Sequence, residues 1–258
     1  MPRYYWMHFY KALAEASPSE IVQSTVDGLL AARCVYRFAR VRESHGGLPA
    51  EGRQAAAGGE LISDVDWPLD EATAYAINDV EFLRSTTRRT ARWPRITLVF
   101  ERDFRFDSKV KALWTARTAR EVRQVTLHFQ VNQDPLFGER VTIALRTWYD
   151  YVLEGGRAET HIFNKRQVVK IAASVCDRVH PHFGWADGSS PADRSYPLLL
   201  AGQWPVENDL VAIGPQLMAR IAAFRPEASP ALVSALDNGG VILGREAGGG
   251  EPDAETAG

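Results

Sequence analysis

Apolar positions recur along the first hundred residues at two spacings. Tyr4 to Tyr10 is almost entirely aromatic or apolar and too short for a helix, which predicts a strand. Ser17-Pro18-Ser19-Glu20 has capping-box spacing with proline at the first helical position. The helix predicted there buries one stripe, formed by Ile21, Val22, Val26, Leu29 and Leu30. A strand over Cys34 to Arg42 and a helix from Asp70 to Arg84 are predicted next.

The middle of the chain is rich in predicted strands. Apolar residues occupy alternate positions from Ile96, from Val125 and from Val141, the pattern of half-buried strands. The third segment is predicted to continue through Trp148 to Val152 and to end at Gly155-Gly156. Successive strands without long helices between them indicate an antiparallel meander. The predicted fold class is therefore α+β, a mostly antiparallel sheet with helices packed on one face.

The last third becomes helical. Asn164-Lys165-Arg166-Gln167 has capping-box spacing, and the apolar stripe that follows predicts a helix to Val179. His180-Pro181 ends that helix, because the residue before proline is pushed out of helical geometry. A short helix is predicted to open at Gly214-Pro215. A final strand is predicted over Val241 to Leu243, after the turn formed by residues 237–240.

The predicted organisation is one α+β domain over residues 1–244, with a mobile loop at 44–60. The loop is rich in glycine and alanine and has no periodicity. Residues 245–258 are dominated by Gly, Glu, Asp and Ala, which predicts a disordered acidic tail.

Composition narrows the functional classes. The chain has 258 residues, and its net charge of −2 argues against an obligate nucleic-acid or membrane-surface binder. Cys34 and Cys176 lie far apart in apolar runs, which favours two buried free thiols over a disulfide. The first residues lack the pattern of a signal peptide, and no apolar run approaches the ~20 residues that span a bilayer. We expect a cytoplasmic protein without membrane contact.

One short segment combines residues that can bind a metal. Two histidines and an aspartate, His180, His182 and Asp187, lie within His180-Pro181-His182-Phe183-Gly184-Trp185-Ala186-Asp187. They would be the ligands of an otherwise uncharacterised metal-dependent hydrolase. The same residues also fit a helix end followed by a strand whose aromatic side chains pack in the core. The sequence contains no nucleophile elbow and no phosphate-binding loop, and we expect no catalytic residue and no cofactor.

A basic stretch runs from Arg84 to Arg123, with twelve basic side chains against four acidic ones. Arginine interleaved with tryptophan binds nucleic acid or an acidic protein partner, and it also occurs as a solvated face above a tryptophan core. The overall charge weighs against nucleic acid. The candidate binding residues of the whole chain are Trp93, Trp114, Arg102, Arg105, Trp185 and Asp187.

The C-terminal third has a recognisable order of segments. The predicted helix to Val179 leads into the His180 to Asp187 segment, followed by Gln203-Trp204-Pro205-Val206, Ile213-Gly214-Pro215-Gln216-Leu217-Met218 and Asn238-Gly239-Gly240-Val241-Ile242-Leu243. This order resembles immunity proteins of bacterial polymorphic-toxin and type VI secretion systems. The resemblance implies an α+β protein that binds and blocks a cognate toxin and has no catalysis of its own. It assigns no individual residue, because each such protein contacts its toxin through a variable face.

Overall fold

The computed structural model describes residues 4–43, 61–86, 95–105, 123–134, 136–148, 158–187, 209–220 and 231–244. Their strands form one ten-stranded sheet in the order β3-β2-β4-β5-β6-β1-β7-β8-β10-β9. Every neighbouring pair is antiparallel. The elements are β1 (Tyr4–Ala12), α1 (Pro18–Ala31), β2 (Val35–Glu43), β3 (Leu61–Val65), α2 (Leu69–Thr86), β4 (Ile96–Glu101), β5 (Gln124–Asp134), β6 (Gly138–Trp148), α5 (Ala158–Val179), β7 (Phe183–Asp187), β8 (Leu210–Ile213), α7 (Pro215–Arg220), β9 (Ala231–Ala235) and β10 (Val241–Gly244).

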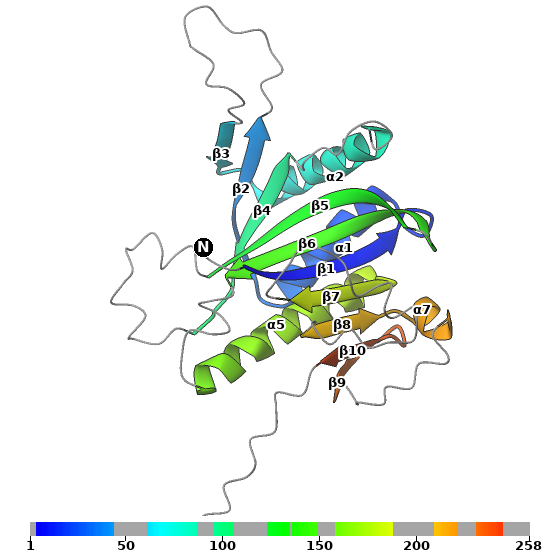
Figure 1. Cartoon of the computed structure of the whole chain (residues 1–258). Coiled ribbons are helices and arrows are strands. Elements are labelled where there is room, and N and C mark those ends of the chain that lie inside the picture. Colours follow the sequence, from blue (N-terminus) through cyan, green and yellow to red (C-terminus); the bar gives the residue numbers. More distant parts are fainter. Residues whose placement is uncertain are drawn as a thin grey trace, which may run out of the picture.

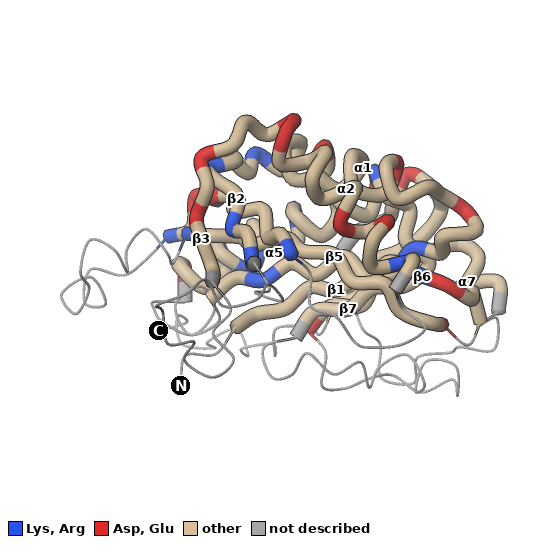
Figure 2. The backbone as a smooth tube through the Cα atoms, turned by 90° about the horizontal axis from the view of Figure 1, so that it is seen from above, with Lys and Arg blue, Asp and Glu red and all other residues tan. Residues whose placement is uncertain are grey.

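Helices α1, α2 and α5 form a layer on one face of the sheet, as Figures 1 and 2 show. Helix α1 begins with the predicted capping box, in which the Ser17 hydroxyl accepts from the Glu20 backbone and the Glu20 carboxylate accepts from the Ser17 backbone. Helices α1 and α5 approach closely at Gly28, where an added Cβ would lie 2.9 Å from the Cα of Val175. The α+β prediction with helices on one face is confirmed.

Both faces of the sheet are packed along β1. Tyr5, Met7 and Phe9 belong to the large core beneath the helices. The alternating Tyr10 joins a second cluster with Phe183 and Trp185 of β7, on the opposite face. This two-sided packing explains why aromatic or apolar residues occupy every position from Tyr4 to Tyr10 except His8.

The start of α5 differs from the prediction. The helix begins at Ala158, six residues before Asn164, so Asn164 is not its cap. The buried Asn164 amide instead binds the backbone of Arg105, accepting from its N–H at 2.8 Å and donating to its carbonyl at 2.8 Å. The predicted end is confirmed, since the helix finishes at Val179 and His180 has a φ of 50°.

Several other predictions have mixed outcomes. Both cysteines are buried and free, as expected. β6 ends at Trp148, and residues 149–157 lie outside the described residues, as do the 44–60 loop and the 245–258 tail. Strands β3, β8 and β9 were not predicted. None of the described helices is long and apolar enough to cross a membrane.

Candidate functional site

Three aromatic side chains gather on the sheet face that points away from the helices. The antiparallel register places Tyr4 of β1 beside Trp148 of β6, and Trp6 beside Arg146. The ring centroids of Tyr4 and Trp148 are 4.9 Å apart, and those of Tyr4 and Trp6 are 6.4 Å apart. β1 and β6 thus hold the rings in a fixed arrangement.

A cation lies among these rings. The Arg146 guanidinium carbon is 4.4 Å from the Tyr4 ring centroid and 5.5 Å from that of Trp6, within cation–π range. Burial lowers the pKa of Arg146, and the nearby Arg40 lowers it further, while Tyr4 opposes the shift. No carboxylate of the described chain forms an ion pair with Arg146. Arg146 is therefore a partly desolvated charge that an incoming carboxylate would stabilise.

A cavity of about 590 Å³ opens beside this cation. We name it the aromatic cleft, and it is lined by Tyr4, Arg40, Ile62, Asp64, Gln124, Thr126, Arg146, Thr147 and Trp148. One wall is the ion pair of Arg40 with Asp64, whose two hydrogen bonds are 2.6 and 3.1 Å long. The same wall carries Ile62, which is 52% exposed, on the edge strand β3. The cleft therefore combines apolar, aromatic and cationic contacts.

The candidate tryptophans do not meet at one site among the described residues. Trp93 and Trp114 lie outside those residues. Trp185 is buried in the second core cluster, where its indole N–H donates to the Tyr10 hydroxyl at 2.8 Å. Asp187 is the last residue of β7, and its backbone pairs with that of Trp6.

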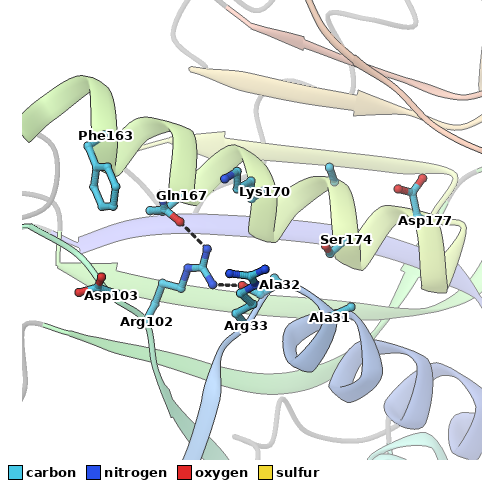
Figure 3. Close-up of a pocket in the computed structure, with 11 residues that line it drawn as sticks. Ala31, Ala32, Arg33, Arg102, Asp103, Phe163, Gln167, Lys170, Ser174 and Asp177 are labelled. Carbon is cyan, nitrogen blue, oxygen red and sulfur yellow. Dashed lines mark hydrogen bonds between the residues drawn. The ribbon is translucent and has the colours of Figure 1, made fainter. Parts of the chain in front are cut away.

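The candidate arginines lie on the other face of the sheet, beyond β4. Arg102 is buried and donates to the carbonyl of Ala32 and to the side-chain oxygen of Gln167 (Figure 3). The Arg105 guanidinium carbon lies 3.8 Å from the ring centroid of Phe163. Both arginines thus brace the N-terminal half of α5, and Arg102 also lines a second cavity.

The three candidate metal ligands do not converge. His180 is exposed at the end of α5, whereas His182 is buried with its Nε2 3.7 Å from Asp134. Asp187 follows His182 by five residues along an extended segment, which at strand geometry separates their Cα atoms by roughly 16 Å. Burial lowers the pKa of His182 to about 4, although Asp134 opposes the shift. No group of three metal-binding side chains occurs in the described part of the chain.

The residues of the aromatic cleft were missing from the candidates drawn from the sequence. The alternation of Tyr4, Trp6 and His8 indicates that their side chains share one strand face. Nothing local connects them to Arg146 and Trp148, because the β1–β6 register brings these together.

Comparison with known proteins adds little to this geometry. The sequence matches no protein-family model and no curated protein. A match among solved structures is the Pseudomonas aeruginosa T6SS protein PA0821, with 12% identity and a TM-score of 0.38. The match covers 93% of this chain and 68% of that one. A likeness at this level carries no argument about function.

Proposed function

We propose that this chain is a protein-binding module that holds an acidic segment of a partner protein in the aromatic cleft. The observation that carries the proposal is Arg146, which stacks on Tyr4 and Trp6 and has no carboxylate partner in the described chain. A carboxylate from the partner would supply the missing charge and accept charge-assisted hydrogen bonds from the guanidinium.

The composition of the cleft supports binding to a protein. Tyrosine, tryptophan and arginine dominate the energetically important positions of protein interfaces, because they bury large areas while retaining polar contacts. The rings of Tyr4 and Trp148 are already packed against each other, so little side-chain freedom is lost on binding. β3 forms one wall and is an edge strand, so an extended partner segment has access from the side of the sheet.

The finer part of the proposal concerns the partner. We infer a cognate bacterial toxin in the cytoplasm, with this chain as its immunity protein. The support is the resemblance of the C-terminal third, together with α5 leading through His180-Pro181 into β7 and the late strand β10. Such a protein neutralises by covering its target, which requires shape and charge complementarity and no nucleophile.

Co-expression with the product of the adjacent gene tests this proposal, because an immunity protein is normally encoded beside its toxin. The wild-type chain is expected to restore growth and to co-elute with that product. Arg146→Ala and Trp148→Ala are each expected to weaken the complex by about tenfold or more. Arg166→Ala, which removes an exposed charge from α5, is the matched control and leaves binding intact.

Two results would contradict the proposal at different levels. No complex and no protection would refute the toxin as the partner. A complex that keeps its affinity in both cleft variants would refute the aromatic cleft as the binding surface. Urea unfolding of each variant shows whether a loss of binding reflects loss of the fold.

A further inference from the structure

Arg102 is a buried cation whose charge the described chain does not neutralise. Its side chain follows β4 and is 8% exposed. It donates to the Ala32 carbonyl and to the Gln167 side-chain oxygen, and both acceptors are neutral. Its Nε is buried without a hydrogen-bond partner, and no carboxylate among the described residues forms an ion pair with it.

The surroundings of Arg102 compensate only part of this charge. Ala32 caps the C-terminus of α1, where the helix dipole supplies about half a negative charge. The charge of Arg102 favours ionisation of the nearby Cys34 thiol, but burial raises the pKa of this thiol to about 12. Cys34 therefore stays neutral and supplies no negative charge. A buried charge without full compensation is unfavourable, and a bound anion would relieve that cost.

Beside Arg102 is a cavity of about 580 Å³, within the size range of small-molecule sites. We name it the Arg102 groove. It follows one stripe of α5, formed by Phe163, Gln167, Lys170, Ser174 and Asp177, and is completed by Ala31, Ala32, Arg33, Arg102, Asp103 and Ala173. Its lining thus joins the end of α1, the end of β4 and the length of α5.

The charges of the groove are arranged unevenly. Arg33 and Lys170 are exposed, and neither has an ion-pair partner in the described chain. Figure 3 shows them with Arg102 in the middle of the groove, while Asp103 and Asp177 lie toward its two ends. Asp177 also accepts a hydrogen bond from the backbone N–H of Asp237 at 3.1 Å. The central part of the groove is therefore positive.

Arg33 is held in a backbone conformation that favours glycine. Its φ is 60°, and it occupies the position after the cap of α1. The Cys34 N–H donates to the Leu29 carbonyl at 2.9 Å and the Arg33 N–H to the Leu30 carbonyl at 2.8 Å, which is the Schellman motif. An arginine in this position is strained, and strained residues of this kind concentrate at functional sites.

We propose that the Arg102 groove binds a small dianion whose charge is carried by oxygen atoms, either a phosphate or a dicarboxylate. Lys170 and Arg33 donate to the oxyanion from the rim, and Arg102 stabilises its charge from below. The Gln167 amide, oriented by accepting from Arg102, retains its NH₂ group as a further donor. Phe163, which lines the same groove, contacts the apolar part of the molecule.

Calorimetric and thermal-shift titrations of the full chain test this site, with phenyl phosphate, inorganic phosphate and succinate as probes. Each probe is compared with chloride at equal ionic strength, so that general screening cancels. Binding of a phosphate or of succinate supports the proposal and identifies which oxyanion the groove prefers. If none of the three binds more tightly than chloride, the proposal is overturned.

Variants locate the site. Lys170→Gln and Arg33→Gly change exposed side chains, and each is expected to weaken binding about tenfold, as for loss of one charge-assisted hydrogen bond. Arg166→Gln removes the same charge from an exposed position of α5 outside the groove and serves as the matched control. An equal loss in Lys170→Gln and Arg166→Gln would overturn the site, since only net charge would then matter. Arg102→Met is expected to abolish binding, and if it fails to fold, the two rim variants still decide the question.

Discussion

His8 makes the stability of the folded chain sensitive to acid. Its side chain is 6% exposed and stacks on Trp185 with ring centroids 4.6 Å apart. Burial, with smaller contributions from the charges of His128 and Arg140, lowers the pKa of His8 to about 3. The unfolded chain takes up this proton below pH ~6.5, whereas the folded chain takes it up only near pH 3.

The magnitude follows from this difference. Above pH ~6.5 His8 is neutral in both the folded and the unfolded chain, so its titration does not reduce the free energy of unfolding there. As the pH falls from ~6.5 toward 3, only the unfolded chain binds the proton, and the free energy of unfolding decreases. Between pH 7 and pH 5 the expected loss is about 2 kcal/mol for this residue alone. His128 and His182, with pKa values lowered to about 4, add losses of similar size over the same interval.

Urea unfolding at pH 7, 6 and 5, followed by tryptophan fluorescence, measures this effect. In His8→Phe, the loss of unfolding free energy from pH 7 to pH 5 is expected to be about 2 kcal/mol smaller than in the wild type. Trp6→Phe is the control, because it alters packing beside His8 without removing a titratable group. The reasoning is refuted if His8→Phe loses as much stability on acidification as the wild type does.

Three further substitutions have defined effects on the urea midpoint. Ser17→Ala removes the capping hydroxyl of α1 and is expected to destabilise by about 1 kcal/mol, while an unchanged midpoint would mean that the cap contributes nothing. Gly28→Ala places a Cβ 2.9 Å from the Cα of Val175, so the α1–α5 contact must open at a cost of roughly 1–3 kcal/mol. Arg33→Gly relieves the left-handed backbone and is expected to stabilise the fold by about 1 kcal/mol while weakening oxyanion binding. A destabilised Arg33→Gly protein would contradict the strain at this position.

Features encoded in neighbouring residues were predictable from the sequence. The capping box at Ser17 and the apolar stripe after it predicted α1, because both signals lie within the helix itself. Alternating positions from Ile96 and Val125 likewise predicted β4 and β5. Antiparallel pairing of β5 with β6 then follows, since only residues 135–137 connect these two strands.

Features determined by distant partners were not predictable. Asn164 has the residue type and spacing of a helix cap, but it binds the backbone of Arg105, far away in the sequence. Strands β8 and β9 have four and five residues, too few for a periodic pattern. β8 is held by pairing with β7 and β10, and β9 by pairing with β10. Local spacing carries no information about such partners.

The candidate sites show the same limit. Arg102 was one of many arginines in the basic stretch. The burial of its side chain depends on contacts with the end of α1 and with α5, which are distant in the sequence. The contact of Arg146 with Tyr4 depends in the same way on the register of β6 against β1. Sequence identifies residue types suited to binding, and tertiary pairing decides which of them carry an uncompensated charge.

Arg102 and Arg146 lie on opposite faces of the sheet, which makes the two proposed sites separable. The Arg102 groove is formed against α1 and α5, whereas the aromatic cleft is on the face away from the helices, and they share no lining residue. Substitutions without shared partners act independently. Arg146→Ala is therefore expected to leave phosphate binding unchanged, and Lys170→Gln to leave the protein complex unchanged. If Arg146→Ala weakens phosphate binding as much as Lys170→Gln does, the oxyanion responds to the overall charge of the chain and not to the built groove.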